Sequence, residues 1–525
     1  MLQSQGALVC SMSVGISIVT LVILLFFYYL VRFYQKRHRF ANIPPGPKPW
    51  PVVGNFVIRR RFGPEADGSS KNAASVLTEL AKLYGPVYSI YAGRQLIVIL
   101  NGYKVVKEAL SSHPEVFSDR PDIPAISIMT KRKADKISGI VFAPYGPVWR
   151  EHRKFCHTTL RSFGLGRLSL EPCIMDGLSN VKTELLRLDA ESGGTGVNPA
   201  PVISNAVSNV ICSLVLGHRF DHRDQEFRSM LRLMDRGLEI CVNSPAVLIN
   251  VFPLLYHLPF GVFSELRQVE RDITAFLKRF IANHLETLDP DNPRDLTDMY
   301  LMEISARRAA GEVDGGFTED YLFYIIGDLF IAGTDTTANS VLWIILYMAS
   351  FPDIQDKVQA EIDEVVGTLR TPSLSDKGKL PFTEAAIMEV QRLTAVVPLA
   401  IPHMTSETIE FGGYTIPKGT VVLPNLWSVH RDPNEWDDPD SFDPTRFLDE
   451  AGKLLRKECF IPFGIGRRVC MGEQLAKMEL FLTTTTLLQA FEVRLPEGVP
   501  APPLHGRFGL TLAPCPYTVC INPRR

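Results

Sequence analysis

Residues 463–472 read Phe-Gly-Ile-Gly-Arg-Arg-Val-Cys-Met-Gly, and they are the most informative stretch of the chain. The three glycines let the backbone approach a flat ligand closely. A helical pattern follows from Glu473 to Leu488, so Cys470 stands just before a helix N-terminus, where amide donors and the helix dipole favour a thiolate. A thiolate can ligate iron, and the arginines beside it can pair with a carboxylate. A buried structural cysteine in a turn is the alternative. A phosphate loop is excluded because Val469 occupies its third glycine position.

The composition is that of a globular protein. Of 525 residues, 46% are hydrophobic and 21% are charged, which excludes a disordered or fibrous chain. Lys plus Arg (55) and Asp plus Glu (57) nearly balance, which argues against a nucleic-acid binder that relies on positive charge. The nine cysteines are odd in number and include no C-x-x-C, so neither a disulfide framework nor a structural zinc site is expected. A reducing cytosolic environment fits them best.

The amino-terminal segment is not globular. The run from Ala7 to Val31 is almost wholly apolar, and as a helix rising ~1.5 Å per residue it spans the ~30 Å hydrocarbon core of a bilayer. The basic residues that follow place the amino end in the lumen and the rest of the chain in the cytosol: Arg32, Lys36, Arg37 and Arg39. A cleaved secretory signal is the alternative, but it would have a basic region first. We therefore expect residues 1–40 to form a signal anchor, and the proline-rich residues 41–50 to form a semi-rigid hinge.

The rest of the chain mixes many helical patterns with a few strands. Val87–Tyr91 and Gln95–Leu100 predict a hairpin, and a second group of strands is expected at Thr408–Phe411, Tyr414–Ile416 and Val421–Leu423. Strands do not alternate regularly with helices, so a doubly wound sheet is a poor fit. The pattern indicates a mainly α protein with small β-sheets.

One long apolar helix is expected from its N-cap Thr318 to Ser350. Its composition also suits a membrane span, but Asp328 and Asp335 lie within it, and charged groups are costly in lipid. A helix buried in a large core is the better interpretation. Pro352 then suits the first turn of the next helix, and Gly367 suits its end.

The pattern Phe463-x-x-Gly466-x-Arg468-x-Cys470-x-Gly472 resembles the haem-binding signature of the cytochrome P-450 superfamily. The resemblance implies haem b as cofactor, with Cys470 as the axial thiolate ligand of the iron. It also implies that Phe463 packs beside the sulfur and that Arg468 meets a haem propionate.

A second motif, Ala332-Gly333-Thr334-Asp335-Thr336-Thr337, lies in the middle of the long helix. Gly, Thr and Asp weaken the helical hydrogen-bond ladder, so a local kink is expected there. The motif resembles the oxygen-binding groove of the family. The resemblance implies that Asp335 and Thr336 form a catalytic acid–alcohol pair that relays protons. An ordinary solvated helix carboxylate is the alternative for Asp335.

Further motifs resemble the haem contacts and the structural core of the family. Trp149-x-x-x-Arg153 is similar to a helix whose indole and guanidinium groups bind a propionate. The resemblance to the microsomal branch adds Arg120 and His403 as propionate contacts, although each is also compatible with an ordinary surface polar group. Glu389-x-x-Arg392 and Pro444-x-Arg446-Phe447 resemble elements that form a buried charge network with a structural role.

The resemblance covers essentially the whole chain, so residues 51–525 are expected to form one catalytic domain, although length alone predicts more domains. Residues 43–47 and 463–481 resemble family two, and residues 321–337, 399–407 and 506–514 resemble its subfamily U of long-chain fatty-acid hydroxylases. The resemblance implies an ω-end hydroxylase of acids such as arachidonic acid. It would use O2 and electrons that a diflavin reductase takes from NADPH, in the endoplasmic reticulum membrane, with the mitochondrial membrane as a second location.

Two other functional classes are alternatives. A haem-thiolate isomerase or dehydratase would not require the acid–alcohol pair, and a haem sensor or anchored scaffold would not need a kinked distal helix. The expected pocket lining is apolar and suits an acyl chain: Phe330, Ile331, Ala332, Val397, Leu399, Ala400, Ile401, Leu510 and Leu512. Arg507 is a candidate partner for the substrate carboxylate, and a solvated turn arginine is the alternative.

Two surfaces are expected to meet partners. Basic residues near the cysteine loop predict a docking face for an acidic reductase: Arg150, Arg153, Lys154, Arg456, Lys457 and Arg467. The apolar residues 247–263, interrupted by two prolines, predict a patch that dips into the bilayer, with a soluble core segment as the alternative.

Overall fold

The computed structural model describes residues 42–50, 54–55, 72–129, 139–221, 223–243, 245–312 and 316–524. The predicted anchor at 1–40 lies outside the described residues. The helices are α3 Ala73–Tyr84, α4 Tyr103–Lys107, α5 Pro114–Phe117, α6 Pro124–Met129, α7 Pro147–Ser162, α8 Glu171–Ser192, α9 Ala200–Val215, α10 Gln225–Asn243, α11 Gly261–Thr287, α12 Leu296–Ala309, α13 Glu319–Ser350, α14 Pro352–Val365, α15 Pro381–Thr394, α16 Leu426–Val429 and α17 Glu473–Ala490. The strands are β1 Val87–Ala92, β2 Gln95–Asn101, β3 His403–Met404, β4 Ile409–Phe411, β5 Tyr414–Ile416, β6 Val421–Asn425, β7 Phe491–Arg494, β8 Arg507–Phe508, β9 Leu512–Ala513 and β10 Cys520–Pro523.

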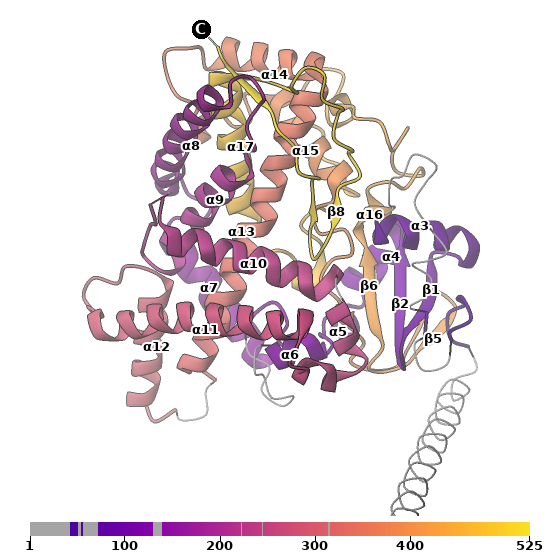
Figure 1. The fold of residues 1–525 in the computed structure, drawn as a ribbon. Coiled ribbons are helices and arrows are strands. Elements are labelled where there is room, and N and C mark those ends of the chain that lie inside the picture. Colours follow the sequence, from indigo (N-terminus) through magenta and orange to yellow (C-terminus); the bar gives the residue numbers. More distant parts are fainter. Residues whose placement is uncertain are drawn as a thin grey trace, which may run out of the picture.

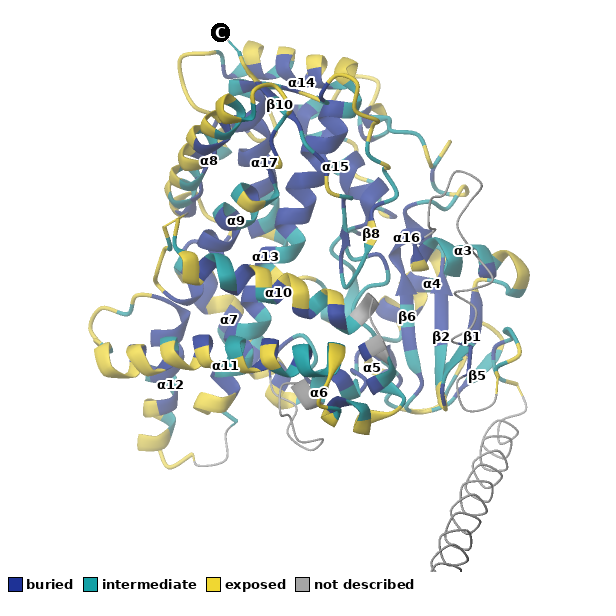
Figure 2. Cartoon of the chain, viewed as in Figure 1, coloured by how far each residue is buried: buried dark blue, intermediate teal, exposed yellow. Residues whose placement is uncertain are grey.

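The long helix α13 runs through the middle of the molecule, and other helices pack around it (Figure 1). Its N-cap is Thr318, as predicted, and the Thr318 hydroxyl accepts a hydrogen bond from the Tyr321 amide at 3.1 Å. In the described part of the chain α13 is the one helix long and apolar enough to cross a membrane, but most of its residues are buried inside the protein (Figure 2). The prediction of a core helix is therefore confirmed.

The motif does not break α13 into two helices, because α13 is assigned as α-helix without interruption from Glu319 to Ser350. Gly333 is instead explained by packing: a Cβ there would lie 2.9 Å from Cγ1 of Ile211 on α9. The missing side chain therefore lets two core helices approach each other.

A small sheet lies to one side of the helices, with the strand order β1-β2-β6-β3 (Figure 1). The predicted hairpin is confirmed by the antiparallel pairing of β1 and β2, which turn at Gly93 with a φ of 57°. The pair β2–β6 is parallel and the pair β3–β6 is antiparallel. The other strands form three two-stranded ribbons: β4–β5, β7–β10 and β8–β9.

One large apolar core includes buried side chains from α7 to β10, and a smaller one lies against the sheet. Because these cores combine segments from both halves of the chain, the protein folds as a mainly α domain with small sheets, as expected. The prediction for the helix after α13 is confirmed, since α14 begins at Pro352 and Gly367 follows its end with a φ of 73°. All eight cysteines among the described residues are free thiols.

Candidate active site

The cysteine loop is closed by main-chain hydrogen bonds. The Cys470 amide donates to the carbonyl of Phe463 at 3.0 Å, and the Gly464 amide donates to the carbonyl of Ile461 at 3.0 Å. Gly466, with a φ of 79°, lies against another chain segment, and a Cβ there would collide with the carbonyl oxygen of Leu110. The close approach that Gly466 permits is therefore to backbone, whereas the sequence suggested a flat ligand. The predicted helix after the loop is confirmed as α17.

Cys470 keeps accessible surface although many protein atoms surround it. Burial raises the pKa of the Cys470 thiol, while the Gly472 amide and the charge of Arg153 act in the opposite direction. Desolvation therefore opposes the thiolate that the loop is expected to favour, whereas the Gly472 amide and Arg153 support it. A metal ion bound to the sulfur would reverse this balance, since coordination deprotonates a thiol.

Three guanidinium groups converge beside this loop. Arg120 is buried and donates to the carbonyls of Val141, Ile401 and Pro402 at 2.9–3.0 Å. Arg468 donates from Nε to the Ser118 carbonyl at 2.9 Å and from Nη2 to the Ala143 carbonyl at 2.7 Å. Arg153 reaches the carbonyl of Val469, next to the cysteine.

These three positive charges act on one another. Burial lowers the pKa of Arg120, and the charges of Arg468 and Arg153 lower it further. Burial also lowers the pKa of Arg468 to about 10, and Arg153 adds to this effect. The negative charge of Asp119 acts in the opposite direction and raises the pKa of both Arg120 and Arg468. Three cations lie close together here, and Asp119 acts on two of them, so the region suits a further anionic group.

Trp149 organises two of these arginines. Its indole N–H donates to the Ile140 carbonyl at 2.9 Å, so this proton is held by main chain. The guanidinium carbon of Arg468 lies 4.1 Å from the ring centroid, and that of Arg153 lies 5.3 Å from it. Trp149 therefore supports both cations through its aromatic face.

His403 is buried, and its Nδ1 lies 2.6 Å from the carbonyl oxygen of Phe117. Burial lowers its pKa well below the usual range, and Arg120 adds to the effect. The ring is thus neutral, with the Nδ1 proton donated to Phe117. Nε2 could donate to an anion only in the imidazolium form, which a bound carboxylate would favour.

The segment Gly139–Ala143 connects the cysteine loop to α13. Arg468 and Trp149 donate to its carbonyls, and Asp328 of α13 accepts hydrogen bonds from the amides of Ile140 and Val141 at 2.7 and 2.9 Å. Sequence reasoning used Asp328 only as evidence against a membrane span. A lone helix carboxylate carries no sequence signal for this task, because its partners are 187 and 188 residues away.

On α13, the predicted acid and alcohol make separate hydrogen bonds. Thr336 donates to the carbonyl of Ala332 at 2.7 Å. Asp335 accepts from Asn339 Nδ2 at 2.9 Å through Oδ1 and from Thr511 Oγ1 at 2.7 Å through Oδ2. Burial raises the pKa of Asp335, and these two donors oppose the rise. Ala332 is exposed, so protein atoms do not cover this face of α13.

The predicted charge network is present. Glu389, with no exposed surface, accepts from Arg392 at 2.7 and 2.8 Å and from Arg446 Nε at 2.8 Å. Arg392 continues to the carbonyls of His430 and Pro439 at 2.7 and 2.6 Å. One carboxylate thus joins two guanidinium groups and ties α15 to the chain that precedes the cysteine loop.

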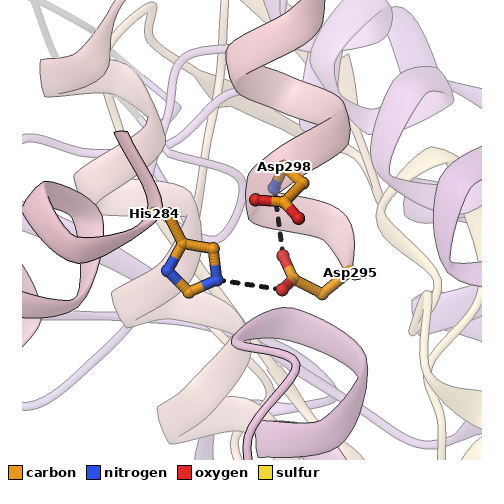
Figure 3. A group of neighbouring side chains, drawn as sticks. All are labelled: His284, Asp295 and Asp298. Carbon is orange, nitrogen blue, oxygen red and sulfur yellow. Dashed lines mark hydrogen bonds and ion pairs between the residues drawn. The ribbon is translucent and has the colours of Figure 1, made fainter. Parts of the chain in front are cut away.

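A second cluster of metal-ligating residue types lies elsewhere, at the ends of α11 and α12 (Figure 3). His284 lies 2.9 Å from Asp295 through Nε2 and 2.8 Å from the Phe280 carbonyl through Nδ1. Arg294 binds both carboxylate oxygens of Asp298 at 2.7 and 2.8 Å. Because protein partners already use these atoms, the cluster is a structural ion-pair group.

Comparison with known proteins identifies the family. The family model described as cytochrome P450 matches residues 44–521. The chain belongs to the cytochrome P450 family. It is 56% identical to cytochrome P450 2U1 of Homo sapiens and 55% identical to that of Mus musculus, over 93% of this chain and 91–92% of those proteins. It is 39% identical to cytochrome P450 2D3 of Rattus norvegicus, over 94% of this chain and 96% of that protein.

The P450 family carries haem b with a cysteine thiolate as axial ligand, and its members are monooxygenases. The residues of this P450 fit that group. Haem b bears two propionates, and the cluster of Arg120, Arg153 and Arg468 offers the matching positive charge next to Cys470. When bound, the haem supplies the oxygen chemistry, and the protein supplies the ligand, the charge and the apolar surroundings.

Proposed function

We propose that this P450 hydroxylates long-chain fatty acids such as arachidonic acid at or near the ω end. It would use O2 and electrons that a diflavin reductase takes from NADPH. The observation that carries the haem part of the proposal is the group of three guanidiniums beside Cys470, of which Arg120 is buried and Arg153 and Arg468 are half-buried. The substrate class rests on the resemblance to subfamily U and on the apolar residues near α13.

In this proposal each site residue has one task. Cys470 ligates the iron, Phe463 closes the loop around it, and Arg468 binds a propionate. Arg120, Trp149, Arg153 and His403 complete the propionate site, with Trp149 acting through its ring because its N–H is engaged. Thr336 and Asp335 would move protons along the face of α13 where Ala332 is left uncovered by protein.

The expected substrate lining needs two corrections. Phe330 and Leu512 are buried in the main core, at 2% and 1% exposure, so they offer no surface to a ligand. Phe330 packs near Phe227, with ring centroids 6.3 Å apart, and the Leu512 amide donates to the Val396 carbonyl. The remaining candidates keep accessible surface: Ile331, Ala332, Val397, Leu399, Ala400, Ile401 and Leu510.

We place the enzyme in the endoplasmic reticulum membrane, with the catalytic domain toward the cytosol and the mitochondrial membrane as a second location. Within the apolar patch predicted at 247–263, Phe252, Leu254 and Phe260 are exposed at 41%, 82% and 63%. Large exposed apolar side chains of this kind suit contact with lipid, so they support a second membrane contact besides the anchor. Tyr256 of the same segment is buried, which agrees in part with the core alternative.

Product analysis tests the proposed function. Isotope-labelled long-chain acids are incubated with the membrane-bound enzyme, a diflavin reductase and NADPH, and mass spectrometry locates the new hydroxyl. We expect hydroxylation at the terminal methyl or the carbon next to it, and no product with Cys470→Ala. Mid-chain products only, or turnover of another lipophile but of no fatty acid, would contradict the proposal. Peroxide rearrangement without reductase would indicate the isomerase class.

A further inference from the structure

The C-terminal hairpin β8–β9 is attached to the middle of α13. Trp343 donates its indole N–H to the Leu512 carbonyl at 2.8 Å, and the Tyr517 hydroxyl donates to the Leu342 carbonyl at 2.7 Å. Gly506 lies against the Trp343 ring, where a Cβ would be 2.6 Å from Cζ2. The Trp343 and Gly506 contacts hold the turn between the two strands, residues 509–511, beside the Asp335 segment.

Thr511 at this turn forms a closed hydrogen-bonded triangle with two residues of α13. Its hydroxyl donates to Asp335 Oδ2 at 2.7 Å and lies 3.2 Å from Asn339 Nδ2. Asn339 in turn donates to Asp335 Oδ1 at 2.9 Å. Thr511 and Asn339 are buried, at 7% and 8% exposure. Both oxygens of the Asp335 carboxylate therefore accept hydrogen bonds from side chains. One of the two donors, Thr511, comes from the C-terminal hairpin.

We propose that Thr511 is a positioning residue that holds the Asp335 carboxylate ready for proton delivery, and that it couples the C-terminal hairpin to this step. The proposal rests on the relay role assigned above to Asp335 and Thr336. It adds a residue that lies 176 positions away in the chain and outside the helix motif.

The chemistry of a hydroxyl suits this task. A threonine hydroxyl both donates and accepts, so it can donate to Asp335 when the carboxylate is ionised and accept from it when the carboxyl is protonated. The contact therefore survives the gain and loss of the proton that a relay requires. A methyl group in its place would leave Oδ2 unpaired in a buried site, which favours the neutral acid.

The hairpin also connects proton delivery to substrate. Leu510, next to Thr511, keeps accessible surface and is one of the proposed lining residues. A ligand that packs against Leu510 would restrain the same turn that orients Asp335. Proton delivery would then be most efficient when the pocket is filled.

Thr511→Val and Thr511→Ser in the full-length holoenzyme test the proposal. Thr511→Val should lower the product formed per NADPH consumed by about fivefold to tenfold, because a buried hydrogen bond to a charged group is lost. It should also move the pH dependence of this ratio upward, since the Asp335 pKa rises further without its donor. Thr511→Ser should keep wild-type values for both quantities.

Two controls separate a local effect from general loosening and from failure of the relay itself. Tyr517→Phe removes a bond between α13 and the segment that follows the hairpin, so it should lower the thermal unfolding temperature without changing the coupling ratio. Asp335→Asn and Thr336→Ala should both uncouple NADPH use from product. If Asp335→Asn and Thr336→Ala uncouple NADPH use from product but Thr511→Val does not, the positioning role of Thr511 is wrong. If neither Asp335→Asn nor Thr336→Ala uncouples NADPH use from product, the relay role of Asp335 and Thr336 is wrong.

Discussion

Asp235 of α10 and Arg507 of β8 are two opposite charges that act on each other near Asp335. Burial raises the pKa of Asp235 to about 6, Asp335 adds to the rise, and Arg507 opposes it. A substrate carboxylate that binds Arg507 therefore meets Asp235 as a competitor. Removing Asp235 should therefore strengthen the contact between Arg507 and a substrate carboxylate.

We expect Arg507→Gln to raise KM for a long-chain acid by about tenfold, the effect of losing one charge-assisted hydrogen bond. Asp235→Asn should lower KM for the same acid, because it removes the competing charge. Steady-state kinetics with the acid and its methyl ester measure both effects, and the ester should respond to neither change. Equal responses of acid and ester would show that Arg507 does not bind the carboxylate.

At the scale of helices, α11 and α12 are joined by a buried ion pair. Burial opposes a charge on His284, but the hydrogen bond and charge of Asp295 outweigh it and raise the pKa of His284. Both ring nitrogens face acceptors, Asp295 and the Phe280 carbonyl, which is consistent with an imidazolium (Figure 3). Asp298, also close by, is neutralised by Arg294.

The sign of the pH effect follows from the raised pKa. Stability from this pair is fully present below the unfolded pKa of about 6.5 and is lost as pH rises through the higher folded pKa. The thermal unfolding temperature should therefore decrease across that range, and His284→Gln should remove this component. Thermal scans at several pH values measure it. If the unfolding temperature of the wild type changes with pH in the same way as that of His284→Gln, His284 is not an imidazolium.

Over the whole molecule, exposed basic side chains lie on the segments that flank the cysteine loop. Arg150, Lys154, Arg456 and Arg467 are exposed, and Arg467 lies near Glu115 at 3.8 Å. Arg153 is half-buried, and its charge acts on Cys470. The predicted docking face for a reductase therefore keeps four exposed cations, and Arg153 is the member that is turned toward the cysteine loop. Lys457 is half-buried, with its ammonium 5.4 Å from the Trp436 ring centroid.

Charge reversal tests this face. Lys154→Glu with Lys457→Glu should weaken association with the reductase and reduce its salt dependence, because fewer opposite charges meet. Lys82→Glu on α3 is the matched control and should leave the affinity unchanged. The affinity is measured by titrating reductase at two ionic strengths. An unaltered affinity in the double variant would argue against this docking face.

Local patterns in the amino-acid order were sufficient for the elements and the loop. Thr318, Pro352 and the run after Gly472 predicted where helices begin, because capping and backbone geometry act within a few residues. The cysteine motif and the Glu389–Arg392 spacing likewise lie within single segments.

Contacts between segments required the folded chain. Packing against Ile211 explains Gly333, burial opposes the Cys470 thiolate, and Thr511 and Asp328 bind partners more than 170 residues away. Burial and pairing depend on which surfaces meet, and short-range patterns do not contain that information.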